Sequence, residues 1–169
     1  MLKRVCLLMA MIWSLGFICT GLKPVVLGNE YSISLFMDDK VLRNPNAALT
    51  GFLEIKPGMK LSVAPVLDLW YSYSPTILPD ISTMTVSVNG IPAESRRLVP
   101  DGAFRSNWQV ALPLTSLREG INEITISVLH RSIEGLCKDI DNDANWFIIR
   151  PETTIKFKVD AMNYSLANF

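Results

Sequence analysis

The chain has 169 residues, with 16 basic residues, 16 acidic residues and a single histidine, so its formal net charge at pH 7 is zero. Three of the basic residues and no acidic residue precede Asn29, which leaves 13 basic against 16 acidic residues in the remainder. This mild acidity argues against nucleic acid or anionic lipid as a main partner. One histidine, His130, leaves no residues for a histidine-based metal site or a Ser-His-Asp triad.

The N-terminus has the features of an export signal. Lys3 and Arg4 form a positively charged region, and the apolar run from Val5 to Cys19 is short for a membrane span. No Ala-x-Ala cleavage site follows it, so residues 1–28 are predicted to be either an export signal or an uncleaved N-terminal anchor. We expect one folded domain over residues 29–160, followed by a truncated tail over residues 161–169.

Residues 29–160 show no helical periodicity of useful length, whereas Gly, Pro and Asn turn signals recur along them at the spacing of short strands. This pattern predicts an all-β fold, specifically an antiparallel β-sandwich of the jelly-roll type. One short helical turn is expected over Leu114 to Arg118. Nine strands are predicted, over Tyr31–Phe36, Leu49–Ile55, Val66–Ser74, Ser82–Asn89, Ile91–Leu98, Asn107–Leu112, Asn122–His130, Trp146–Ile149 and Thr153–Val159.

The strand predicted over Val66–Ser74 alternates with the period of two that indicates one buried face and one face toward water. The core face is expected to hold Leu67, Leu69, Tyr71 and Tyr73, and the water face Asp68, Trp70, Ser72 and Ser74. The strand over Ser82–Asn89 ends at Asn89-Gly90, two residue types that accept the positive φ angles of a type I′ hairpin turn. A returning strand through Ile91 is therefore predicted.

Four sequence elements together resemble a known family. They are SYSPTILPDIS with VSVNG (Ser72 to Gly90), VALPLTSLREGINEITISV (Val110 to Val128), LCKDIDNDANW (Leu136 to Trp146) and the strand that follows it. In this order they resemble the first periplasmic domain of the regulatory B subunit of bacterial cellulose synthase, over about Tyr31 to Val159. That family is often labelled cyclic di-GMP-binding, but no phosphate-cradling glycine loop supports the label here, and Arg96-Arg97 is a lone basic pair.

The resemblance implies a non-catalytic accessory subunit, of which this chain is a fragment. Such a subunit lies on the periplasmic or extracytoplasmic face of the cell membrane, supports the membrane-embedded catalytic glycosyltransferase and guides exported β-1,4-glucan. It implies no cofactor and no enzymatic activity. Two alternatives stay open: a free-standing sugar-binding lectin or adhesin with the same sandwich, and a purely structural assembly module.

Tryptophan side chains are the candidates for contact with carbohydrate or with a partner, because flat rings stack on the C–H faces of a sugar while nearby polar groups bind its hydroxyls. Trp70 is the first candidate, and Asp68, beside it on the predicted outer face, is the polar candidate for the same contact. The alternative for Trp70 is that a neighbouring loop covers it. Trp146 is the second candidate and is compatible with surface or core. Trp108 shares a face with Val110 and is expected to lie in the core.

Asp139, Asp141 and Asp143 have the alternate spacing of the first ligands of a calcium loop. The loop then fails, because Ala144 replaces the required glycine and Arg150 replaces the bidentate glutamate. The three aspartates are therefore weak metal candidates, and a solvated acidic loop is expected. The same cluster and Asp38-Asp39 are the acidic pairs available for glycoside hydrolysis, but both lie in apparent loops, so no enzyme is predicted.

Cys137 is the single cysteine that follows the leader. Exported domains usually pair their cysteines, so an odd thiol leaves two interpretations. It is either a buried small apolar residue or one half of a disulfide whose other half lies outside this chain.

Overall fold

The computed structural model describes residues 29–134 and 143–160. Within these ranges it contains ten strands and three short 3₁₀ helices, with no α-helix, which confirms the predicted all-β fold class. No helix in the described ranges has the length and apolarity that a membrane crossing requires. The predicted leader over residues 1–28, the tail over residues 161–169, and Cys137 lie outside the described residues.

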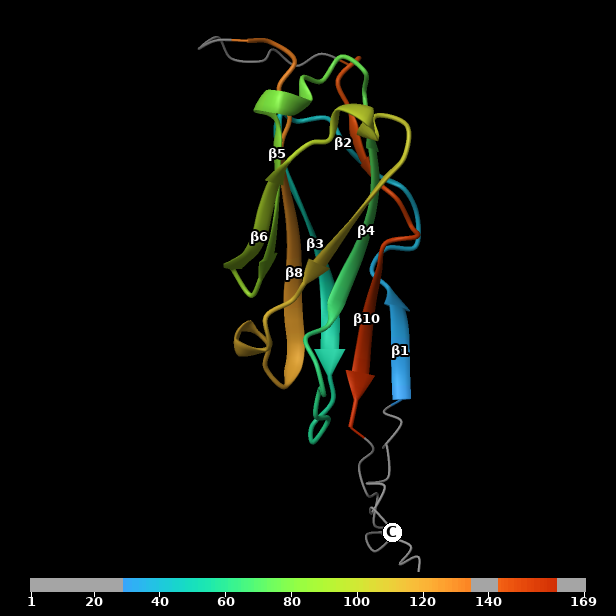
Figure 1. Cartoon of the computed structure of the whole chain (residues 1–169), viewed down its shortest axis with the longest axis vertical. Coiled ribbons are helices and arrows are strands. Elements are labelled where there is room, and N and C mark those ends of the chain that lie inside the picture. The colour runs from blue at the N-terminus through green and yellow to red at the C-terminus, as the bar shows by residue number, and fades with distance from the viewer. Residues whose placement is uncertain (1–28, 135–142, 161–169) are drawn as a thin grey trace, which may run out of the picture.

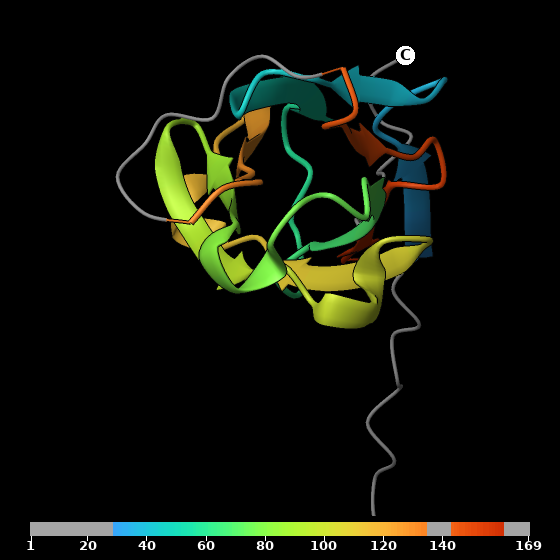
Figure 2. The same ribbon diagram turned by 90° about the horizontal axis from the view of Figure 1, so that it is seen from above.

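The strands form two antiparallel sheets that pack face to face (Figure 1). Sheet A contains β1 (Asn29–Ser34), β2 (Lys40–Leu42), β4 (Val66–Tyr73), β7 (Ser106–Ala111), β9 (Phe147–Ile149) and β10 (Thr154–Val159). Sheet B contains β3 (Asn46–Ile55), β5 (Thr83–Val88), β6 (Ile91–Arg97) and β8 (Gly120–Leu129). The 3₁₀ helices are η1 (Pro79–Ile81), η2 (Pro100–Gly102) and η3 (Leu114–Ser116). Seen from above, the strands surround a common interior (Figure 2).

The strand order is that of a jelly roll. Along one edge of β4, the first half pairs with β10 and the second half with β9, so β9 and β10 act as one strand interrupted at residues 150–153. On the far side of this interrupted strand, β1 pairs with β10 and β2 pairs with β9, so β1 and β2 likewise share one position in the sheet. With each interrupted pair counted as one strand, the chain alternates between the two sheets except at the β5–β6 hairpin, which confirms the predicted jelly-roll sandwich.

The core lies between the sheets and consists of the side chains that the alternating pattern assigns to it. Leu67, Leu69, Tyr71 and Tyr73 of β4 are buried, as are Ile124, Ile126 and Val128 of β8 and, as expected, Trp108 of β7. The rings of Tyr71 and Phe147 stack with their centroids 5.4 Å apart. Removal of this apolar surface from water, at about 25 cal/mol per Å², is the main stabilising contribution.

The Asn89-Gly90 turn is observed where it was predicted. Asn89 has a φ of 50° and Gly90 a φ of 81°, the left-handed angles that a type I′ turn requires at both central residues. The turn pairs Val88 with Ile91 and so begins the β5–β6 hairpin. A short helical turn also occurs where expected, as η3.

Three sequence expectations need correction. The ten strands include β2, which was not predicted. The other strands differ from their predicted ends by up to three residues. The outer face of β4 was expected to meet water, but Asp68, Ser72 and Ser74 are buried. β4 is a central strand, so side chains of its neighbours on both edges cover its outer face. His130, expected to end β8, directly follows it and is buried.

Candidate functional site

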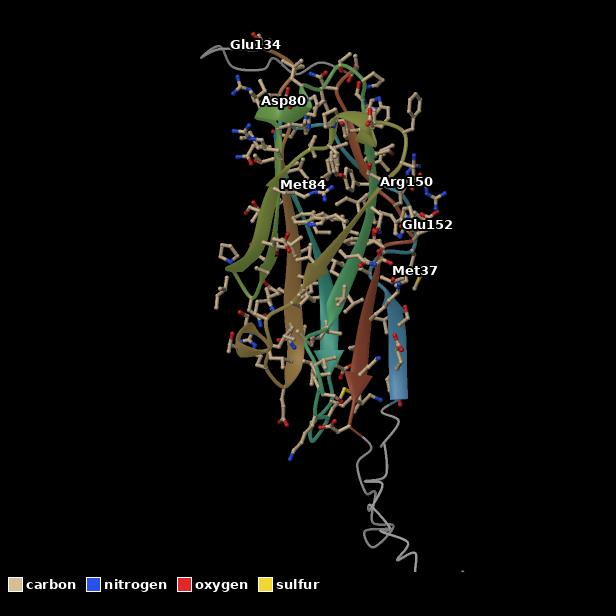
Figure 3. The ribbon with its side chains drawn as sticks, viewed as in Figure 1. Met37, Asp80, Met84, Glu134, Arg150 and Glu152 are labelled. Carbon is tan, nitrogen blue, oxygen red and sulfur yellow. The ribbon has the colours of Figure 1, made fainter. Side chains whose placement is uncertain are left out.

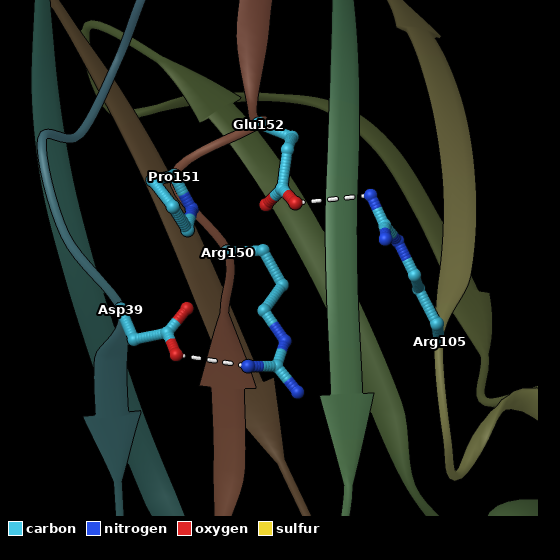
Figure 4. A pocket seen from close by; sticks show the side chains of 5 residues that line it. All are labelled: Asp39, Arg105, Arg150, Pro151 and Glu152. Atoms are coloured by element: carbon cyan, nitrogen blue, oxygen red, sulfur yellow. Dashed lines mark hydrogen bonds and ion pairs between the residues drawn. The ribbon is translucent and has the colours of Figure 1, made fainter.

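An open pocket of about 560 Å³ lies on the outer side of sheet A. It is formed where three segments distant in sequence meet: the bend before β2, the loop before β7, and the interruption between β9 and β10. Figure 4 shows the pocket, with Arg105 and Glu152 on opposite sides of β4 and their ion pair drawn across that strand. Its lining residues are Asp39, Arg105, Arg150, Pro151 and Glu152.

The interruption between β9 and β10 has a local cause. Pro151 has no N–H to donate to a strand ladder. Thr153 replaces the missing pairing with its side chain, since its Oγ1 accepts a hydrogen bond from Trp70 N at 3.1 Å and donates one to Trp70 O at 3.2 Å. Arg150 N also donates to Trp70 O, at 2.9 Å. The chain between Arg150 and Thr153 therefore leaves the sheet while both flanks stay bound to β4.

Two ion pairs span the pocket. Arg150 Nη1 donates to Asp39 Oδ2 at 2.8 Å, and Arg105 Nη2 donates to Glu152 Oε1 at 2.9 Å. All four side chains are partly exposed, so each pair adds little to stability. Because the two positive and two negative charges balance, the pocket lining carries no net charge.

Trp70 lies on the outer face of sheet A, as the alternating pattern predicts, and is half-buried. The guanidinium carbon of Arg105 is 4.8 Å from the centroid of its ring, within the range of a cation–π interaction. Thus the loop before β7 covers Trp70 from outside, which was the alternative considered for this residue. Trp70 forms the floor beneath Arg105.

Asp68 also lies on this face, two residues before Trp70, but it is only 8% exposed. Lys156 Nζ of β10 donates to its Oδ2 at 2.8 Å, and Asn107 Nδ2 of β7 donates to its Oδ1. Burial is the largest single influence and acts to raise the pKa of Asp68, but the hydrogen bonds from Lys156 and Asn107 together hold it below the ordinary 3.8. The hydrogen bond to Asp68 in turn raises the pKa of Lys156. Asp68 therefore links the three strands that support Trp70.

The other candidates in the described part of the chain, Trp146 and Asp143, do not line the pocket. Trp146 is partly exposed and precedes β9, where its carbonyl oxygen accepts a hydrogen bond from Ser74 N at 2.9 Å, beyond the end of β4. Asp143 is exposed, and Arg43 Nη1 donates to its carbonyl oxygen at 2.7 Å. Asp139 and Asp141 lie outside the described residues. In the described ranges, no cluster of three acidic, histidine or cysteine side chains is placed to hold a metal ion.

Sequence reasoning did not identify Arg105, Glu152 or Arg150 as site residues. Arg150 was considered only as the wrong residue for a calcium loop, and Asp39 only as part of an acidic pair. The structure separates that pair, because Asp38 binds Lys40 at 2.6 Å whereas Asp39 binds Arg150. A proline between two predicted strands was the available signal, since it marks a break from which side chains project.

Residues 42–161 match a family model described as "Cellulose synthase BcsB, first CBM domain". The match covers more than half of the chain and includes β3 to β10. No curated protein sequence gives a significant match.

Solved structures with a similar arrangement come from diverse proteins. The CBM36-1 domain of a multidomain xylanase from the hindgut metagenome of Trinervitermes trinervoides is 11% identical, with a TM-score of 0.38 over 76% of this chain and 96% of that chain. TmCBM61, solved with β-1,4-galactotriose, is 14% identical, with a TM-score of 0.39 over 76% and 88% of the two chains. The delta-endotoxin Cry8Ea1 of Bacillus thuringiensis is 12% identical, with a TM-score of 0.43 over 78% of this chain, which spans 20% of the endotoxin.

Proposed function

Because this chain belongs to the family of the first CBM domain of cellulose synthase BcsB, we propose that it is part of a non-catalytic accessory subunit of a bacterial cellulose synthase. The observation that carries the proposal is the family match over residues 42–161. In this role the domain makes and breaks no bond. It supports the catalytic glycosyltransferase and helps guide the exported β-1,4-glucan.

The proposed location is the periplasmic or extracytoplasmic face of the cell membrane. The positive residues and apolar run of residues 1–28 support export or N-terminal anchoring. The partners proposed there are the membrane-embedded catalytic subunit and the glucan that leaves it. The excess of acidic over basic residues after Asn29 fits a partner other than nucleic acid.

The proposed contact surface is the outer face of sheet A around Trp70. Half-burial of a large ring beside an open pocket supports this assignment. Asp68 acts there as a positioning residue, since it links β4 to Lys156 and Asn107. Trp146 is the candidate for a separate contact beyond the end of β4.

The arrangement of acids in the pocket favours contact over catalysis. Asp39 and Glu152 are each held by an arginine. Glycoside hydrolysis needs a carboxylic acid that keeps its proton, usually through burial without a positive partner. Paired carboxylates of this kind are suited to accept hydrogen bonds from hydroxyl groups.

Co-purification tests the proposal. The full-length protein that carries this chain is expected to be retained by its tagged catalytic glycosyltransferase subunit from detergent-solubilised membranes. An unrelated exported β-sandwich of the same size serves as the control. If the protein instead passes into the flow-through and binds tightly to a sugar array, the lectin or adhesin alternative is favoured and the accessory role is refuted.

A further inference from the structure

We infer that Asn89 is a site of spontaneous deamidation which the folded domain suppresses, so that chains that stay unfolded are chemically converted and lose folding stability. The inference concerns the chemistry of the chain itself and does not depend on the accessory role proposed above. The sequence supplies the site, because Asn89-Gly90 is the single Asn-Gly pair in the chain. Glycine has no side chain to hinder attack by its backbone nitrogen.

The reaction needs only the chain and water. The backbone nitrogen of Gly90 loses its proton and attacks Asn89 Cγ. A C–N bond forms, the bond from Cγ to Nδ2 breaks, and ammonia leaves with the proton. Water then opens the resulting succinimide ring at either carbonyl carbon, which gives aspartate or isoaspartate and returns a proton to the nitrogen. No oxidant or reductant takes part, and alkaline pH accelerates the first step because the nitrogen must lose its proton.

In the folded domain, both polar atoms of the Asn89 side chain are bound. Nδ2 donates to Ser116 O at 2.8 Å and to Asn122 Oδ1 at 2.9 Å, and Oδ1 accepts a hydrogen bond from Glu123 N at 3.0 Å. Figure 1 shows the turn between β5 and β6 beside η3, the helix that contains Ser116. Rotation of the half-buried side chain for ring closure would break these bonds together and leave polar groups unpaired.

The backbone that carries Asn89 is also fixed. Asn89 N donates to Glu123 O at 2.9 Å, and β5 lies between β6 and β8 in sheet B. The strand is anchored in the core by Met84, which is labelled in Figure 3, and by Val86 and Val88, all three buried. The turn therefore opens only together with this part of the sandwich, and the rate of deamidation is limited by the population of that open state.

The products do not fit the native turn. Aspartate in place of Asn89 keeps an acceptor for Glu123 N but has no donor for Ser116 O or Asn122 Oδ1, so its negative charge meets two acceptor oxygens. Asn122 cannot compensate by turning its amide over, because its Oδ1 accepts from Arg118 N and its Nδ2 donates to Arg118 O. Isoaspartate adds one carbon to the backbone of a two-residue turn, and turn length sets the register of a hairpin.

Peptide mass mapping of the full chain tests the inference. The protein is incubated at mildly alkaline pH, either folded in buffer or unfolded in guanidinium chloride, and is then digested with trypsin. The peptide of residues 61–96 contains Asn89 as its one asparagine and contains no glutamine, so the mass gained when –NH₂ is replaced by –OH reports this residue alone. Conversion is expected to be at least about tenfold slower in the folded protein, a ratio that an opening free energy of about 1.4 kcal/mol already gives.

The peptide of residues 106–118 is the matched control, because its asparagine, Asn107, precedes the bulky Trp108 and should stay unconverted in both states. Asn89→Asp reproduces one product and is expected to lower the folding equilibrium constant about tenfold, since two acceptors lose their donor. Converted wild-type protein is expected to refold in lower yield than unconverted protein after dilution from denaturant.

Equal rates of conversion in the folded and unfolded states would overturn the inference, as would the absence of conversion in denaturant. Wild-type stability of Asn89→Asp, or full refolding of converted protein, would also overturn it, because the hydrogen bonds of the Asn89 amide would then not be needed for the native turn.

Discussion

Asp68 points outward from sheet A and is nevertheless buried. Its two oxygens accept hydrogen bonds from different neighbouring strands, β10 through Lys156 and β7 through Asn107. A buried carboxylate is tolerated only when it is bound in this way. At the scale of single residues, Asp68 is therefore a satisfied polar contact beside Trp70, whereas the buried hydroxyl of Ser72 on the same face has no hydrogen-bond partner in the described part of the chain.

Asp68→Asn is expected to lower the free energy of unfolding at pH 7 by about 1 kcal/mol, because a charge-assisted hydrogen bond is lost. An unfolded aspartate has a pKa of about 3.9, and the folded pKa of Asp68 is lower. The carboxylate therefore contributes stability above the unfolded value, and this contribution is lost as the pH falls through the folded value. Urea unfolding at a series of pH values should show the wild-type and variant curves converging in acid. A constant difference down to pH 2 would contradict this role, and exposed Asp80→Asn is the control.

Trp70→Ala is expected to weaken retention on glucan or association with the partner while the fold is kept. The ring is half-buried on the outer face and holds Arg105 at 4.8 Å, so its loss frees Arg105 and alters the pocket more than the core. Affinity electrophoresis in a β-glucan gel and thermal melting measure the two effects. Unchanged retention combined with a large loss of stability would show that Trp70 only packs.

At the scale of elements, the sequence predicts a structure when the residues that determine it are neighbours in the chain. The β5–β6 hairpin follows from the alternation before Asn89-Gly90 and from the φ preferences of those two residues. The network around Asn122 does not. This buried side chain binds Arg118 N and O and accepts a hydrogen bond from Asn89, which joins β8 to the hairpin turn. Its polarity alone gave no reason to place it inside.

Gly90→Ala is expected to destabilise the domain by about 1 kcal/mol. Gly90 has a φ of 81°, and a Cβ at this position would meet no atom within 4 Å, so the cost comes from the backbone angle and not from a clash. The midpoint of chemical denaturation measures it. An unchanged midpoint would mean that the turn relaxes to a conformation without positive φ, against the type I′ assignment.

At the scale of the whole molecule, the fold class was predictable and most of the pocket was not. Alternation within one strand places Trp70 and Asp68 on the outer face of sheet A. The structure confirms that both side chains lie on this face, but Asp68 is buried and Trp70 is half-buried. Asp39, Arg105 and Glu152 converge only because the jelly-roll order brings the segments before β2, before β7 and after β9 to one side of sheet A. No local pattern contains that information.

We propose above all that this β-sandwich is part of a non-catalytic accessory subunit of a glucan synthase. The most direct test of this proposal is the glucan output of the catalytic subunit in proteoliposomes, measured with and without the full-length protein that carries this chain. We predict that output requires the protein and that the protein alone neither forms nor cleaves glucan. Equal output in its absence, or turnover of glucan by the protein alone, would contradict the account.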